Sequence, residues 1–190
     1  EFYELKKLIG TFINLFKSNN YDYIKFDEIL KRLKYGNDYI FIKIVREIYL
    51  EYMSELKSKN EVDFNDMIND AIKVLNKGGK IKSYKYIIID EYQDTSLTKY
   101  NMIKTIKNKT QAKLFCVGDD FQSIYRFTGC NLNIFLNFKK YYINSRIMKI
   151  ENTYRNCKDL IKVSGNFIMK NNHQMRKKLK SSKKLKKPIK

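Results

Sequence analysis

The amino-acid sequence predicts an α/β fold in which a parallel sheet is preceded by a helical segment. Apolar residues recur at helical spacing through residues 5–75. From residue 85 onward, short continuous apolar runs instead alternate with helical patterns. Strands that alternate with helices are typical of parallel sheets, whose crossover connections are right-handed.

The helical segment contains four amphipathic patterns, which cover residues 5–16, 26–33, 41–56 and 64–75. The fourth begins after Asp63, a good N-cap because its carboxylate can accept a hydrogen bond from a free N–H group of the first turn. We interpret the apolar stripes as core-forming faces and assign no chemistry to them.

Three apolar runs, at residues 86–89, 114–117 and 147–150, have the continuous character of strands buried on both faces. Helical patterns over residues 97–106 and 160–168 follow the first and third runs. In a parallel sheet, ligands bind beyond the carboxyl ends of the strands. The polar residues directly after each run are therefore the candidates for chemistry.

An acidic pair, Asp90 and Glu91, follows the first run. An aspartate at the end of a buried strand can ligate Mg²⁺ through oxygen, and an adjacent glutamate can polarise a water aimed at a γ-phosphate. A simple acidic turn or a helix N-terminus is the alternative interpretation of this pair.

The segments after the second and third runs contain a glutamine, two aromatic residues and an arginine. Gln122 can sense a phosphate. Tyr125 and Phe127 can offer stacking faces to bases, although such a pair is also typical of a core. Arg155 can neutralise charge that develops on a transferred phosphoryl group. The three segments occur in order, each after a predicted strand, and this joint pattern favours a functional site.

The chain is strongly basic. Its 190 residues include 39 Lys and Arg against 20 Asp and Glu, a formal net charge of +19. No acidic residue follows Asp159, and the lysine-rich end contains the only proline, Pro188. This charge indicates a polyanionic partner, either nucleic acid or an anionic membrane. Compositional drift from AT-rich coding DNA is the other explanation of the charge.

Simple counts exclude several classes of protein. No apolar run approaches the roughly 18–20 residues that cross a bilayer, and the first residues lack the pattern of a signal peptide. Cys116, Cys130, Cys157 and the single histidine, His173, form neither a disulfide framework nor a zinc site. We therefore expect no membrane-spanning segment and a reducing, cytoplasmic location.

Four segments resemble a known family. The runs IDEYQD at residues 89–94, VGDDFQSIYRFTG at 117–129 and NTYR at 152–155 resemble motifs II, III and IV of the UvrD/Rep group of superfamily 1 helicases. The run VDFNDM at 62–67 resembles helicase IV-like members of that group. The resemblance covers residues 61–190 with specific motifs, and the first third only in its helical character.

The resemblance implies a partial RecA-like P-loop NTPase fold with a parallel sheet. Residues 1–60 would form an inserted helical subdomain, 61–148 part of the first RecA-like ATPase domain, and 149–190 the start of a second one. The implied cofactors are ATP and Mg²⁺. The implied partners are single-stranded DNA, junctions of single- and double-stranded DNA, and the remainder of the protein's own chain, with no membrane partner.

The resemblance also implies a role for each polar residue that would meet the nucleotide. Asp90 would coordinate Mg²⁺, and Glu91 would act as the general base for the attacking water. Gln122 would contact the γ-phosphate and link its state to the bound strand. Tyr154 would stack near the adenine, and Arg155 would reach the γ-phosphate from the second domain.

Tyr125 and Phe127 would, by the same resemblance, stack the bases of single-stranded DNA. That role agrees with the sequence-tolerant platform that an aromatic pair can form. Thr128 stands in this loop where many members of the group have arginine, which is a departure from the family pattern.

No P-loop of the form GxxxxGK[ST], whose backbone N–H groups cradle phosphates, occurs in the sequence. Gly79 and Lys80 are followed by Ile81, and Val74 stands where the first glycine belongs. We therefore expect a central fragment, with the P-loop upstream and the last motifs downstream, that is inactive in ATP hydrolysis alone.

Three functions remain as hypotheses. The first, which we favour, is the central part of an ATP-dependent 3′→5′ DNA helicase and translocase. The second is a nucleic-acid-binding fragment without catalysis. The third is the motor subunit of a recombination helicase–nuclease complex, for which this sequence supplies no nuclease domain.

Overall fold

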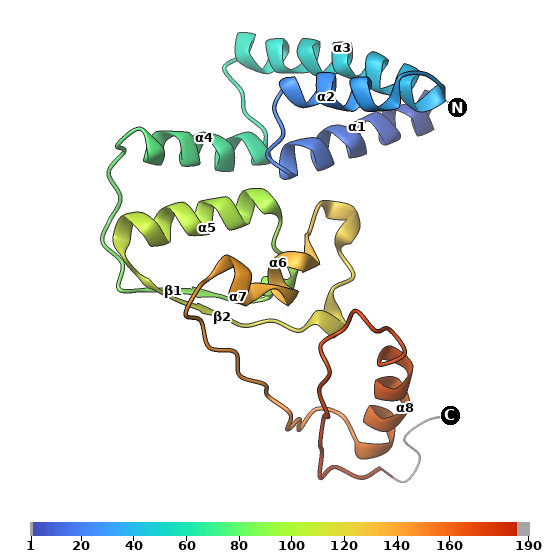
Figure 1. The fold of residues 1–190 in the computed structure, drawn as a ribbon, viewed down its shortest axis with the longest axis vertical. Helices are drawn as coiled ribbons and strands as arrows, with labels where there is room; N and C mark the ends of the chain where they lie inside the picture. Colours follow the sequence, from blue (N-terminus) through green and yellow to red (C-terminus); the bar gives the residue numbers. More distant parts are fainter. Residues whose placement is uncertain (1, 186–190) are drawn as a thin grey trace.

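The computed structural model describes residues 2–185, which form three successive parts (Figure 1). Helices α1 to α3 come first, then α4 and α5 with a small sheet, and finally α8 with its flanking segments. Residue 1 and residues 186–190, with Pro188, lie outside the described residues. Among the described helices, none has the length and hydropathy that a membrane-spanning helix requires.

The first part packs α1 (Phe2–Ser18), α2 (Ile24–Leu33) and α3 (Asn37–Ser58) around an aromatic core. The rings of Phe16 and Phe26 stack there with their centroids 4.3 Å apart. The buried members of this core are Phe16, Phe26, Ile42, Val45 and Tyr49. Burial of these apolar stripes stabilises helices of a length that is marginal in isolation. The predicted helices in this part of the chain are confirmed.

The second part is a layer of helices on a two-stranded parallel sheet. Helices α4 and α5 pack side by side, and β1 pairs with β2 (Figure 1). The elements of this part are α4 (Phe64–Asn76), β1 (Tyr86–Ile89), α5 (Leu97–Thr110), β2 (Lys113–Cys116), α6 (Leu132–Leu136) and α7 (Phe138–Tyr141). Asp63 caps α4 as predicted, because its side chain accepts the N–H of Asp66. The structure is mixed helical with a small parallel sheet, consistent with a partial α/β fold.

Described residues cover only one face of the sheet, so the prediction of strands buried on both faces is wrong for this part of the chain. Tyr86, Ile88 and Phe115 are 64%, 71% and 53% exposed. Ile89 and Leu114 point the other way and pack against a core contributed mainly by α5, α6 and α7. Alternate residues of a strand point to opposite faces, so helices on one side cover only half of each apolar run.

The third predicted strand, at residues 147–150, does not form. The segment just after it pairs instead with the chain that follows α8 (Lys158–Ile168). Asn152 and Lys180 form an isolated parallel bridge, and the N–H of Thr153 donates to the Lys180 carbonyl at 2.9 Å. A strand is stabilised by hydrogen bonds to a neighbour, and no described strand lies beside residues 147–150.

Candidate functional site

An acidic pair at the carboxyl end of β1 forms the first part of the candidate site. Asp90 and Glu91 are both exposed, and Oδ1 of Asp90 accepts the backbone N–H of Glu91 at 2.8 Å. Glu91 has φ 50° and ψ 41°, in the left-handed region that non-glycine residues rarely adopt. This turn leads into the short helix η1 (Tyr92–Asp94). Strained backbone of this kind is concentrated at functional sites.

Gln93, which no sequence pattern singled out, joins the ends of the two strands. It is only 1% exposed. Its Nε2 donates to Oε2 of Glu91 at 2.7 Å, and its Oε1 accepts the N–H of Asp119 at 3.0 Å. Gly118 leaves the necessary space, because a Cβ there would lie 2.7 Å from Oε1 of Gln93. A buried amide that is bonded at both ends restricts the orientation of the Glu91 carboxylate.

The loop after β2 holds Gln122 through a carboxylate. Gln122 lies at the end of the short helix η2 (Asp120–Gln122), and its Nε2 donates to Oδ2 of Asp119 at 2.9 Å. Burial would raise the pKa of Asp119, but the hydrogen bond from Gln122 and the ammonium of Lys177 hold that pKa below its ordinary value. Asp119 is therefore a carboxylate at neutral pH. It accepts from Gln122 while its N–H donates to Gln93, so the two loops are joined.

Tyr125 and Phe127 form an exposed aromatic pair, which excludes the alternative that they are core residues of the described structure. Tyr125 directly precedes the short helix η3 (Arg126–Thr128), and Phe127 is its second residue. Their ring centroids lie 6.1 Å apart with an interplanar angle of 51°, and the residues are 47% and 68% exposed. Two exposed rings at this spacing present flat faces to which bases can stack.

The loop that contains Tyr125 and Phe127, called the aromatic loop below, contacts both α1 and the segment after the acidic pair. Gly129, which ends η3 with φ +94°, lies so close to α1 that a Cβ would fall 2.2 Å from Oγ of Ser18. Sγ of Cys130 donates to the Asp94 carbonyl at 3.1 Å. Since Asp94 ends η1, the loop that presents the aromatic pair is bonded directly to the segment that follows the acidic pair.

A surface hollow of about 380 Å³ borders the acidic pair. Its lining includes the acidic residues Asp90, Glu91 and Asp94, together with Ile68 of α4 and Lys99 of α5. Oδ1 of Asp94 is buried without a hydrogen-bond partner among the described residues. A buried carboxylate oxygen of this kind is costly unless a donor or a cation reaches it. A hollow of this volume, lined by three acidic residues, is large enough to admit a small ligand or a hydrated cation.

The structure does not bring Tyr154 and Arg155 to the acidic pair. Both are exposed and precede α8, which Figure 1 places below the sheet. The described bonds of Arg155 stay within its own part of the chain, where its carbonyl accepts from Nζ of Lys183 at 3.3 Å. The family resemblance implied that Tyr154 and Arg155 meet the nucleotide together with Glu91. In the described structure they lie in a different part of the chain from Glu91.

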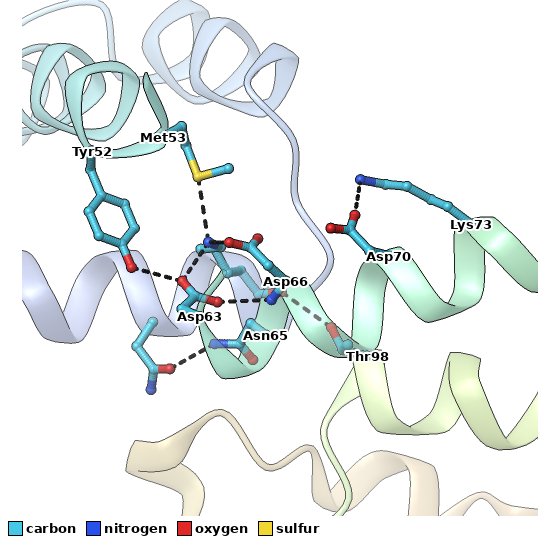
Figure 2. Close-up of polar contacts among 10 residues, drawn as sticks. Tyr52, Met53, Asp63, Asn65, Asp66, Asp70, Lys73 and Thr98 are labelled. Carbon is cyan, nitrogen blue, oxygen red and sulfur yellow. Dashed lines mark hydrogen bonds and ion pairs between the residues drawn. The ribbon is translucent and has the colours of Figure 1, made fainter. Parts of the chain in front are cut away.

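A buried polar network, which no sequence pattern indicated beyond the capping role of Asp63, joins the helical part to α4 and α5 (Figure 2). Lys17 of α1 is 2% exposed, and its Nζ lies 2.5 Å from Asp63 and 2.6 Å from Asp66. Tyr52 donates to Asp63 at 3.0 Å, and burial together with this bond raises the pKa of Tyr52 to about 12. Thr98 of α5 donates to the carbonyl of Ser18 at 2.9 Å. Four helices are thus connected at one point.

Comparison with known proteins identifies the relatives of the chain. The family model for the UvrD/REP helicase N-terminal domain matches residues 4–143. The chain is 34% identical to DNA helicase IV of Escherichia coli K12 over 141 residues, and 33% identical to the ATP-dependent DNA helicase PcrA of Leuconostoc citreum over 147. It is 38% identical to the ATP-dependent DNA helicase Rep of Buchnera aphidicola from Acyrthosiphon pisum over 138 residues.

These alignments cover 74%, 75% and 70% of the chain, respectively. They cover 21%, 20% and 21% of the relatives. The chain therefore spans about a fifth of the length of the curated relatives that it matches.

Proposed function

Because the chain belongs to the UvrD/Rep helicase family, we propose that it is the central part of an ATP-dependent DNA helicase. In this proposal the whole protein uses ATP hydrolysis to move 3′→5′ along single-stranded DNA and acts at junctions with duplex. The names of the relatives support ATP-dependent action on DNA, while the direction of movement and the DNA form rest on the family resemblance alone.

The observation that carries this proposal is a continuous connection between an acidic pair and an exposed aromatic loop. Glu91 is bonded to Gln93, and Gln93 to Asp119, which holds Gln122. The same loop continues to Tyr125 and Phe127, which would stack successive bases of a single strand. An ATPase that moves on DNA needs such a mechanical link between the group that activates water and the surface that meets the strand.

The residues at the end of β1 fit a divalent cation. Mg²⁺ takes oxygen ligands, keeps several waters, and is commonly held by one or two carboxylates together with substrate phosphates. Asp90 is exposed and lines the hollow together with Asp94, whose Oδ1 is buried without a hydrogen-bond partner among the described residues. No cluster of three potential ligand side chains occurs among residues 2–185. When bound with ATP, the ion would neutralise charge on the phosphate oxygens.

The protein's own side chains would perform the remaining steps. Glu91 would accept a proton from the attacking water, with its carboxylate oriented by Gln93. Gln122 would contact the γ-phosphate and report its presence through Asp119. Arg155 would supply positive charge to the γ-phosphate, with Tyr154 near the adenine, once the second domain closes on the nucleotide.

The domain organisation follows from the same proposal. Residues 61–148 would be part of a RecA-like ATPase domain, 1–60 an inserted helical subdomain, and 149–190 the start of a second RecA-like domain. The parallel pairing of β1 and β2, with the candidate site at their carboxyl ends, supports this assignment. The exposed apolar face of the sheet also fits a larger sheet-and-helix domain.

A Glu91→Gln substitution in the full-length protein tests the catalytic assignment. The variant should lose ATP turnover by about 100-fold or more while retaining nucleotide and DNA binding, because the amide cannot accept the proton of water. Glu51→Gln, at an exposed position of α3, is the matched control and should behave as wild type. Near-normal hydrolysis by Glu91→Gln would refute the role of Glu91. DNA binding by a wild type without any ATP turnover would favour the non-catalytic alternative.

A further inference from the structure

A lysine from beyond α8 inserts between two carboxylates of the loop after β2. Nζ of Lys177 forms ion pairs with Asp119 and, at 3.0 Å, with Asp120. The same ammonium lies 3.9 Å from the ring centroid of Phe121, a cation–π contact. The Lys177 side chain is only 14% exposed, and that of Asp120 only 1%. The N–H of Met175 adds a hydrogen bond of 2.7 Å to the other oxygen of Asp120.

This contact is built into the structure rather than a chance meeting of surface charges. Exposed ion pairs contribute little to stability. The buried ammonium of Lys177 has lost most of its hydration, so loss of its two carboxylate partners would leave an uncompensated buried charge. Asp119 and Asp120 are neighbours in the chain, so their like charges would repel each other without Lys177. The segment that contains Lys177 is also held by the Asn152–Lys180 bridge, which connects it to the run before α8.

The carboxylate of Asp119 is shared between Lys177 and the candidate site. One of its oxygens faces Lys177, and the other accepts from Gln122 at 2.9 Å. Its N–H donates to Gln93, which in turn donates to Glu91. The ammonium of Lys177 is therefore linked through Asp119 to the glutamine, and through Gln93 to the general base.

We propose that Lys177 is a positioning residue that couples the segment after α8, residues 169–185, to the orientation of Gln122 and Glu91. This inference rests on the proposed function, since the coupling matters only if those two residues act on ATP. With Lys177 in place, Asp119 keeps one oxygen directed to Gln122. When the segment moves away, the adjacent carboxylates lose their shared counter-ion, and Asp119 turns toward water or another donor. The position of the segment after α8 thereby controls whether the water-activating groups are aligned.

The test compares three variants of the full-length protein. Lys177→Met keeps the length of the side chain but removes its charge, Lys177→Arg keeps the charge, and Lys178→Ala alters an exposed neighbouring lysine as the matched control. We expect Lys177→Met to lower the kcat of DNA-stimulated ATP hydrolysis by about tenfold, a size typical of coupling between sites. The KM for ATP and the affinity for oligo(dT) should change by less than about threefold, because Lys177 is placed on neither ligand. Lys177→Arg should recover most of the rate.

Hydrogen–deuterium exchange measures the contact independently of ATP turnover. Lys177→Met should raise exchange at residues 119–122 and 175–180, whereas Lys178→Ala should not. A kcat of Lys177→Met equal to that of Lys178→Ala would overturn the proposal, as would an equal loss of kcat in Lys177→Arg and Lys177→Met. A wild type without ATP turnover would refute the proposed function and the coupling together. Unchanged exchange in an active Lys177→Met variant would refute the contact alone.

Discussion

Substitution of Lys17 by methionine tests the buried network that joins the helical part of the chain to α4. Methionine keeps the length of the side chain and its contact with apolar neighbours but removes the ammonium. The two carboxylates that Lys17 contacts, Asp63 and Asp66, are 23% and 14% exposed, so neither can recover full hydration. The variant therefore leaves two partly buried negative charges side by side without a counter-ion.

The expected loss of stability follows from this burial. Removal of one partner of a buried ion pair costs about 3–5 kcal/mol. Asp63 retains its hydrogen bonds from the Asp66 N–H and from Tyr52, and both carboxylates keep some solvent contact, so we take the low end, about 3 kcal/mol. For a chain of this size, that loss corresponds to a decrease in Tm of about 6–12 °C.

Urea unfolding followed by far-ultraviolet circular dichroism measures the change. Lys7→Met, at an exposed position of the same helix, is the control and should alter the free energy of unfolding by less than about 0.5 kcal/mol. A triple variant that adds Asp63→Asn and Asp66→Asn should recover part of the loss, because it removes the uncompensated charge. If Lys17→Met were as stable as Lys7→Met, the structural role of the network would be refuted.

The pH dependence provides a second measurement of the same network. Burial would raise the pKa of Asp63. The hydrogen bonds from Lys17, from the Asp66 N–H and from Tyr52, together with the charge of Lys17, hold the pKa of Asp63 below its ordinary value. A carboxyl with a lowered folded-state pKa contributes stability that is present above its unfolded pKa, about 4, and lost as pH falls through the folded pKa. The stability difference between wild type and Lys17→Met should therefore be largest above pH 4 and narrow below it.

Two further predictions concern the aromatic loop and the packing beneath the acidic pair. Phe127→Ala should weaken binding of the full-length protein to oligo(dT) by about 5- to 150-fold in fluorescence anisotropy, the equivalent of one lost base stack, without changing the salt dependence. Tyr35→Ala, at another exposed aromatic residue, should bind normally, and equal affinities for the two variants would exclude the stacking role. Gly118→Ala should destabilise the chain by about 1–3 kcal/mol in urea unfolding, because the new Cβ would lie 2.7 Å from Oε1 of Gln93. Gly10→Ala, in open space on a helix, should be neutral or stabilising, and a similarly tolerant Gly118→Ala would contradict the close contact.

Local patterns predicted the elements that their own residues determine. The helical stripes, the capping aspartate Asp63 and the strands near residues 86–89 and 114–117 are all present, the second shifted by one residue. Each depends on spacing or on a bond within a few residues, so the sequence alone carries the information. The placement of Asp90 and Glu91 directly after a strand was predictable for the same reason.

Two predictions that depended on a neighbouring element were wrong, although the predicted parallel pairing of the first two strands is present. The run at residues 147–150 has the composition of a strand, yet it has no neighbour to pair with among the described residues. The same reason explains Ile88, which is apolar but 71% exposed, because no described element covers its face of the sheet. The apolar composition of a segment shows that its side chains can be buried. Whether they are buried depends on which elements pack against the segment.

The amino-acid sequence by itself determined the family, the order of the motifs and the residue types at the ends of the strands. Only the tertiary structure decided how these residues are connected. Gln93, Lys17 and Lys177 are a common amide and two of many lysines in the sequence, and each acquires its role by burial beside a partner that is distant along the chain. For the two lysines that partner is a pair of carboxylates, and for Gln93 it is the backbone N–H of Asp119. The +19 charge illustrates the difference, since it indicates a polyanionic partner but not which lysine is buried. Electrostatic interactions depend on separation and burial, and folding alone sets both.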